Sequence, residues 1–251
     1  MKQNQSKPFF KKMINSKFWI AVLLCWIFAT NATAQGFDDV ELRQHVTLSY
    51  RINKNLGIAG KYFLQTDKGI THFNESTLGL EVDYKINKWL KAGIEYRFGT
   101  NQYEDANIIR YYLGFDYAIN KKWKIKYRPL LQQEFGYLNS EYLAHHPTKY
   151  TLRNMLMVQY DLTKKITLYA YTENYTRFKS GDAYFFREKT GVGASYQIKK
   201  RHEIELEVDW IKKHNRDNIA RIDIGYTFEI GYVKSKKDKT SKPTEATPNA
   251  Q

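Results

Sequence analysis

LGLEVDYKINKWLKAGIEYRF, residues 78–98, is the stretch that decides the fold of this chain. On both sides of its central Asn87-Lys88, apolar residues occupy every second position and glycine or charged residues fill the positions between them. A helix would place apolar residues three and four apart, so strict alternation predicts two β-strands, each with one apolar and one polar face. The Asn-Lys pair between the two runs is typical of a tight hairpin turn.

This turn pattern recurs along the chain, and alternating runs flank each copy. The copies are Tyr50–Leu56, Tyr84–Leu90, Tyr117–Trp123, Tyr160–Ile166 and the looser Tyr196–His202. Five hairpins give ten strands, and Ile219–Ile230 adds another. Bacterial single-chain membrane barrels have an even number of strands, so we expect 10 to 12 and favour 12, with Phe37–Arg43 as a separate short strand.

The length and chemistry of the runs favour a transmembrane barrel over a soluble one. The strands are about 10 to 13 residues long, as a tilted crossing of a bilayer requires, whereas ordinary strands average five or six. The apolar face carries no charge, and the charged face also carries Gly, Ser and Thr, which is typical of a lipid-facing exterior and a polar lumen. A soluble lipocalin-like barrel or sandwich would place the charges outside. We therefore predict an all-β, antiparallel, up-and-down transmembrane β-barrel.

Aromatic residues gather beside the short turns. They are Tyr50, Tyr84, Trp89, Tyr117, Trp123, Tyr160 and Tyr196. In a closed sheet these residues would form a ring at one membrane interface, where a ring with a polar tip is stable. Short turns of outer-membrane barrels face the periplasm, so the longest connection, with Tyr142, His145 and His146, is expected outside the cell.

Both ends of the chain differ in composition from its middle. Residues 1–34 combine five lysines, the apolar run Phe18–Ala29 and Ala32-Thr33-Ala34, which together indicate a cleaved signal peptide rather than an uncleaved anchor. Residues 35–231 would be the barrel, and residues 232–251 a disordered polar tail. Cys25 would leave with the signal, so a disulfide scaffold is excluded. The 251-residue chain has 40 Lys and Arg against 26 Asp and Glu, but export argues against a nucleic-acid partner.

The period of two assigns a set of charged side chains to the lumen. The candidate lumen charge network is Glu81, Asp83, Glu95, Arg97, Arg110, Arg128, Arg153, Glu173, Arg187, Glu203, Glu205, Glu207, Asp209 and Arg221. Opposite charges at this density are expected to pair across the lumen and fill it. The acidic row Glu203–Asp209 needs neighbouring cations, for which Arg187, Lys189 and Arg221 are the candidates. A cation path along this row is the alternative interpretation, although no metal-ligand signature and no cofactor motif is present.

The last alternating run resembles the assembly signal of outer-membrane barrels. Asp223, Gly225, Phe228 and Ile230 stand at its polar, glycine and two hydrophobic positions. Together with the repeated hairpins and the inward arginines, this makes the chain resemble an uncharacterised outer-membrane family of Bacteroidetes type, domain-of-unknown-function family 2490, over roughly Phe37–Ile230. The resemblance implies a barrel in the outer membrane of a Gram-negative bacterium and brings no known activity.

Three functions remain open at this point. A narrow or plugged barrel acting at its loops or lumen is favoured, a small-solute or ion channel is the first alternative, and a lipid-modifying enzyme is the second. His45 and Ser49 lie about 13 Å apart along one strand, too far for a catalytic hydrogen bond, so no catalytic residues are assigned. The expected partners are outer-membrane lipid, the barrel-assembly machinery, and a small solute or an extracellular ligand.

Overall fold

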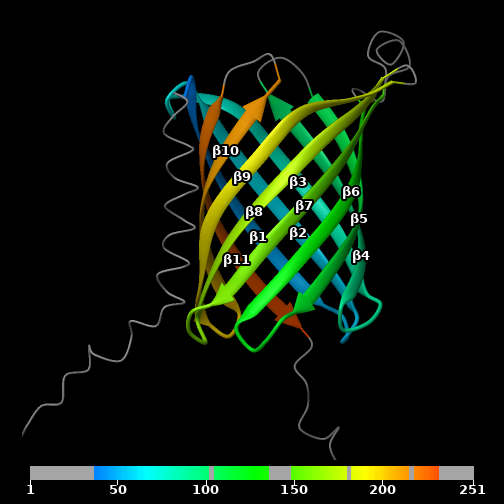
Figure 1. Ribbon diagram of the computed structural model, residues 1–251, viewed down its shortest axis with the longest axis vertical. Coiled ribbons are helices and arrows are strands. Elements are labelled where there is room, and N and C mark those ends of the chain that lie inside the picture. The colour runs from blue at the N-terminus through cyan, green and yellow to red at the C-terminus, as the bar shows by residue number, and fades with distance from the viewer. Residues whose placement is uncertain (1–36, 102–104, 136–147, 180–181, 215–217, 232–251) are drawn as a thin grey trace, which may run out of the picture.

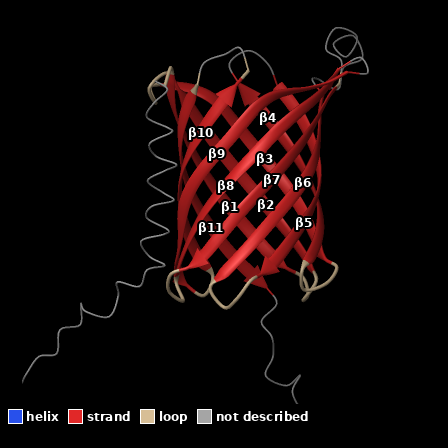
Figure 2. Ribbon diagram, in the orientation of Figure 1, coloured by secondary structure: helices blue, strands red, loops and turns tan. Residues whose placement is uncertain are grey.

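A computed structural model describes residues 37–101, 105–135, 148–179, 182–214 and 218–231. These residues form a closed β-barrel (Figure 1; Figure 2). Its strands are β1 (Asp39–Arg51), β2 (Leu56–Asp67), β3 (His72–Lys85), β4 (Leu90–Asn101), β5 (Asp105–Ala118), β6 (Trp123–Phe135), β7 (Lys149–Asp161), β8 (Ile166–Lys179), β9 (Asp182–Lys199), β10 (His202–Lys213) and β11 (Ile219–Gly231). The signal segment 1–34, the tail 232–251 and the loop residues Tyr142, His145 and His146 lie outside the described residues.

The described strands form an antiparallel meander that is closed by one parallel pair. Each strand pairs with its neighbours in sequence, and β1 runs parallel to β11 from the pair Asp39 and Ile219 to the pair Arg51 and Gly231. An odd number of strands in a meander makes the first and the last run in the same direction. The all-β barrel is therefore confirmed within the expected range of 10 to 12 strands. The favoured twelfth strand is not found in the described ranges, because the residues assigned to it continue without a break into β1.

The repeated Asn closes three of the short turns with its own side chain. The carboxamide oxygen Oδ1 of Asn87 accepts hydrogen bonds from the backbone N–H groups of Trp89 and Leu90, both at 2.9 Å. Asn53 and Asn120 accept the equivalent pairs of bonds, and the hydroxyl of Thr163 takes this place in the fourth turn. The motif thus specifies a turn in which a side chain replaces a backbone acceptor.

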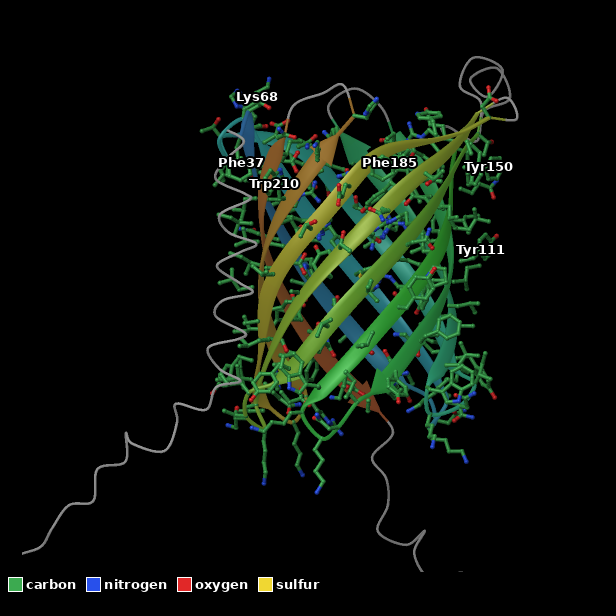
Figure 3. All side chains as sticks on the ribbon, in the orientation of Figure 1. Phe37, Lys68, Tyr111, Tyr150, Phe185 and Trp210 are labelled. Carbon is green, nitrogen blue, oxygen red and sulfur yellow. The ribbon has the colours of Figure 1, made fainter. Side chains whose placement is uncertain are left out.

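The two faces of the wall are chemically opposite. Leu78 and Leu80 are 63% and 55% exposed on the outside, whereas the inward Glu95 is 4% exposed. Figure 3 shows outward aromatic side chains such as Tyr111 and Tyr150 at the wall. The core of this barrel is therefore its lumen, and apolar side chains cover its outer surface. Among the described residues, no helix is long and apolar enough to cross a membrane.

Candidate functional site

The lumen holds a cavity of about 700 Å³ whose walls are mainly charged. Twelve Lys or Arg side chains and eight Glu side chains line it. The lining reaches the loop end of the barrel at Asn74, Arg177 and Lys213, and it extends toward the turns as far as Lys91 and Glu205. Several inward residues of the turn-side part, such as Asp83, Lys126, Asp161 and Glu203, do not line this cavity, although Lys91, the second residue of β4, does. Most of the cavity lining therefore lies in the middle and loop-side parts of the lumen.

Glu95 neutralises three cations on three strands. Its carboxylate lies 3.1 Å from Lys61 Nζ, 2.9 Å from Arg97 Nη2 and 3.3 Å from Arg110 Nη1. Lys61 also pairs with Glu81, whose other oxygen accepts a 2.6 Å hydrogen bond from the hydroxyl of Tyr112. A carboxylate so placed fixes the long side chains around it, because each charge-assisted bond restrains one cation.

Glu173 is a second centre of this kind. The guanidinium of Arg153 donates from Nε at 3.1 Å and from Nη2 at 2.9 Å, and Arg128 Nη2 lies 3.5 Å away. The hydroxyl of Tyr175 donates to the same carboxylate at 2.7 Å. Glu173 is only 2% exposed, so removal of its charge would leave Arg153 without a counter-charge.

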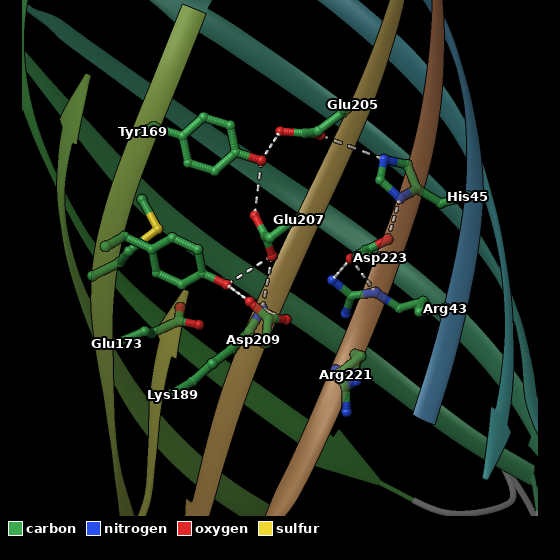
Figure 4. Close-up of polar contacts among 12 residues, drawn as sticks. Arg43, His45, Tyr169, Glu173, Lys189, Glu205, Glu207, Asp209, Arg221 and Asp223 are labelled. Carbon is green, nitrogen blue, oxygen red and sulfur yellow. Dashed lines mark hydrogen bonds and ion pairs between the residues drawn. The ribbon is translucent and has the colours of Figure 1, made fainter. Parts of the chain in front are cut away.

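The acidic row of β10 is held by tyrosines and one lysine (Figure 4). The hydroxyl of Tyr169 lies 2.5 Å from Glu205 and 3.0 Å from Glu207. The hydroxyl of Tyr171 lies 2.7 Å from Glu207 and also contacts Asp209. Lys189 Nζ lies 3.3 Å from Glu207 and 2.7 Å from Asp209. Of the three candidate cations for this row, Lys189 contacts it, and phenol groups supply further hydrogen bonds.

The closing seam between β1 and β11 has its own ion pairs. Asp223 accepts from Arg43 Nε at 2.6 Å and lies 3.0 Å from His45 Nδ1 (Figure 4). Nearer the loops, Arg221 Nη2 donates to Glu41 at 2.6 Å. The parallel pair that closes the barrel is thus joined by side chains as well as by the backbone ladder.

One group of carboxylates is close enough to hold a metal ion. Glu207, Asp209 and Asp223 each offer an oxygen within 4.8 Å of the others. Lys189 pairs with Glu207 and Asp209, Arg43 pairs with Asp223, and the hydroxyl of Tyr171 lies within hydrogen-bond distance of Glu207 and Asp209. Because these acids already have cationic and phenol partners, we assign no metal or cofactor to them.

The ion pairs of the described residues follow the wall and do not cross the lumen. They join residues of one strand, as Arg97 and Glu95 on β4 do, of neighbouring strands, as Arg153 on β7 and Glu173 on β8 do, or of strands one further apart. The expectation that opposite charges pair across the barrel and fill it was therefore wrong, and the cavity remains between the walls. Ion pairs form between neighbouring strands and not across the lumen because side chains on neighbouring strands start about 5 Å apart, well within the reach of a salt bridge.

Four residues of the candidate charge network take places that differ from expectation. Arg221 pairs with Glu41 and does not contact the acidic row. Arg187 makes no ion pair with any described residue, although Lys189, two positions on, does. Asp83 pairs with Arg51 at 2.8 Å near the turns, away from the cavity. Glu203, at the turn end of β10, is exposed. The alternation along each strand predicted which side chains point into the lumen, but not how far each one lies from the turns.

Four inward aromatic residues were not predicted from the sequence. Tyr112, Tyr169, Tyr171 and Tyr175 are all buried in the lumen. Three of them lie against an inward glycine of an adjacent strand: Tyr112 against Gly93, Tyr169 against Gly193 and Tyr171 against Gly191. A usable signal was present, because each of these tyrosines shares its parity with a charged residue of its own strand.

The aromatic residues that the repeat placed beside the turns all lie at the turn end of the barrel. Tyr50, Tyr84, Trp89, Tyr117 and Tyr196 are between 45% and 69% exposed. Trp123 and Tyr160 are half-buried because their rings pack together, with centroids 4.7 Å apart.

No serine and histidine are hydrogen-bonded to each other in the described ranges. His45 binds Asp223, His202 lies 2.7 Å from the hydroxyl of Tyr226, and Ser76 donates to Tyr62. The assembly-signal residues divide between the faces: Asp223 and Gly225 point inward, Gly225 against the ring of His45, while Phe228 stacks on His202. Ile230 pairs with Tyr50 at the turn end.

A family model described as "Protein of unknown function (DUF2490)" matches residues 41–220. No curated protein matches the chain. Among solved structures, the chain is similar to the NanC porin, with 13% identity, a TM-score of 0.48, and coverage of 76% of this chain and 99% of that one. It is also similar to an outer membrane channel from Pseudomonas putida F1, with 12% identity, a TM-score of 0.49, and coverage of 72% of this chain and 79% of that one. LpxR from Salmonella typhimurium shows 11% identity, a TM-score of 0.49, and coverage of 73% of this chain and 87% of that one.

Proposed function

The chain belongs to the DUF2490 family, which brings no activity with it, so we propose a function from the barrel itself. We propose an outer-membrane barrel with a narrow, charged lumen that binds at its loop-side end and does not carry bulk solute. The cavity carries this proposal, because twelve cationic side chains and eight glutamates line it and ion pairs join them along its wall.

The outer surface supports a place in a membrane. Leu48, Leu80, Leu206 and Val208 are each about half exposed, and exposed large hydrophobic side chains occur on all eleven described strands. Soluble monomers rarely expose contiguous apolar patches beyond a few hundred Å², so an apolar wall of this extent favours lipid as its surroundings. The strands of 12 to 18 residues are long enough to cross a bilayer at a tilt.

Loop lengths and aromatic residues support one orientation. The short Asn-capped turns would face the periplasm, and the exposed tyrosines and tryptophan beside them would lie at the inner interface of that membrane. The cavity would then open toward the outside of the cell. Export by a cleaved signal peptide, contact with the assembly machinery and a role for residues 223–230 as an assembly signal complete the proposal.

The lumen supports binding over bulk transport. An eleven-stranded barrel is much narrower than the 16- to 18-stranded porins that hold an aqueous channel. Here the lumen is narrowed further by long side chains such as Arg97, Arg153 and Glu173, which ion pairs hold in place.

Planar-bilayer recording of the purified, folded protein tests this proposal. We expect little steady conductance from the wild-type barrel. Charge reversal at Arg128 or Arg153 should raise the conductance or destabilise the fold, because either change leaves Glu173 less neutralised. Large, stable, ohmic channels from the wild type would overturn the proposal and favour a small-solute channel.

A further inference from the structure

Two arginines of the cavity lack an acidic partner. Arg177 on β8 and Arg187 on β9 both line the cavity, and neither makes an ion pair or a hydrogen bond within the described part of the chain. The Nε atom of each is buried without an acceptor. The same is true of Nε in Arg97 and Arg128, which line the same cavity. Guanidinium N–H groups are costly to bury unpaired, so these arginines need an acceptor.

Aromatic rings hold the unpaired arginines in fixed places. The guanidinium carbon of Arg177 lies 4.3 Å from the ring centre of Phe186. The guanidinium carbons of Arg187 and Arg153 lie 5.0 Å and 4.7 Å from the ring centre of Tyr175. The two rings meet edge to face, with centroids 6.1 Å apart. Three guanidinium groups therefore stand on one aromatic platform, which we define as Tyr175 and Phe186.

A β-bulge builds this platform. The register of β8 and β9 shifts between Tyr175 and Thr176. Tyr175 therefore faces Arg187, Thr176 faces Phe185, and Phe186 has no registered partner on β8. The extra residue lets the ring of Phe186 line the cavity beside Arg187. Bulges of this kind commonly redirect side chains at functional positions.

Two carboxylates of the cavity wall, Glu173 and Glu41, are already engaged by other groups. Glu173 is occupied by Arg153, Arg128 and Tyr175, and Glu41 is occupied by Arg221 and Gln65. Rotation of either acid toward the unpaired arginines would break existing bonds. A bound anionic group would supply the acceptor that these two acids do not.

We propose that the loop-side lumen binds a solute bearing two or more oxyanion groups, with Arg177 and Arg187 on the aromatic platform as its principal ligands. Carboxylate, sulfate and phosphate share the geometry that a planar guanidinium fork recognises. The inference rests on the proposed function only in taking this cavity as the binding site, and it does not require the lumen to be closed.

Calorimetric titration and thermal unfolding of the purified full-length chain, folded in detergent, test the inference. Pyrophosphate and citrate are the probes that separate phosphate from carboxylate recognition; trehalose and Ca²⁺ are the neutral and cationic controls. We expect saturable binding of at least one anion, a raised unfolding temperature in its presence, and weaker binding at high salt. Arg177→Gln and Arg187→Gln should each weaken binding about tenfold, as loss of one charge-assisted contact does.

The matched control is Arg51→Gln, which alters an inward arginine near the turns that does not line the cavity and is paired with Asp83. It should bind the anion as the wild type does. Retained heat-modifiable migration on gels shows that each variant is folded. Absence of saturable anion binding, equal loss of binding in Arg51→Gln, or selective binding of Ca²⁺ would each overturn the inference. A conducting barrel that binds anions contradicts only the proposed low conductance, and a non-conducting barrel that binds none contradicts only this inference.

Discussion

The ring of Tyr171 lies against Gly191, its registered partner on β9, so closely that a side chain at Gly191 would collide with it. A Cβ atom there would lie 2.6 Å from Cε1 of the tyrosine and 2.5 Å from Oδ1 of Asp209. The ring cannot move aside freely, because it is buried and its hydroxyl is bonded to Glu207 and Asp209. The glycines of the lumen are therefore as much a part of the charged site as its acids.

Gly191→Val should destabilise the barrel by about 1 to 3 kcal/mol, because overpacking displaces Tyr171 from its carboxylate partners. The measurement is the urea unfolding midpoint of the detergent-folded protein. Gly60→Val is the matched control, since a Cβ atom at Gly60 meets nothing within 4 Å. Equal stability of the two variants would show that the contact between Tyr171 and Gly191 is not tight in solution.

The alternation of Leu80 and Glu81 predicts opposite responses at adjacent positions. Leu80→Arg should impair membrane insertion, because a charge on the lipid face of a barrel costs roughly 2 to 4 kcal/mol near the bilayer midplane. Glu81→Gln keeps hydrogen-bonding atoms beside Lys61 and Tyr112 and should be milder. Heat-modifiable migration and outer-membrane fractionation of both variants measure the difference. The reverse order would invalidate the assignment of the two faces.

The alternation of apolar and polar residues predicted the two faces, the hairpins and the closed barrel, but it does not determine which charged residues form ion pairs. Arg187 and Lys189 share a face on β9, yet only Lys189 reaches Glu207 and Asp209, because Arg187 lies two residues nearer the loops and opposite Tyr175. Neither the bulge at Phe186 nor the parallel closure of β1 on β11 has a local sequence signal. Inward tyrosines were missed because an aromatic residue fits the apolar face equally well.

Glu95→Gln should destabilise the barrel by about 3 kcal/mol, because it leaves Lys61, Arg97 and Arg110 with too little negative charge around them. Denaturant unfolding at constant ionic strength gives the change. Asp161→Asn is the control: its partner Lys124 is 40% exposed, and exposed pairs contribute about 1 kcal/mol or less. If both variants lose the same small amount, the lumen is hydrated enough to screen its charges.

Asn87→Ala should slow hairpin formation and lower stability by about 1 kcal/mol, since two backbone N–H groups lose their shared acceptor. Refolding from urea into detergent, followed by tryptophan fluorescence, measures both effects. Lys88→Ala changes the same turn without removing that acceptor, and it should refold as the wild type does. A larger effect from Lys88→Ala would show that the charge of Lys88, and not the hydrogen bonds accepted by Asn87, stabilises the turn.

Asp223 combines two roles that one substitution can separate. It neutralises Arg43 across the closing seam, and it stands at the polar position of the segment that resembles an assembly signal. Asp223→Asn keeps a polar residue but removes the charge, so we expect normal amounts in the outer membrane together with a loss of about 3 kcal/mol in the stability of the refolded barrel. Asp223→Leu should lower both the amount of protein in the outer membrane and the stability of the refolded barrel. The control is Glu134→Gln, because its partner Lys149 is 47% exposed and the change should be nearly silent. If Asp223→Asn blocked assembly in cells while the refolded barrel kept its full stability, the residue would act in recognition by the assembly machinery and not in holding β1 to β11.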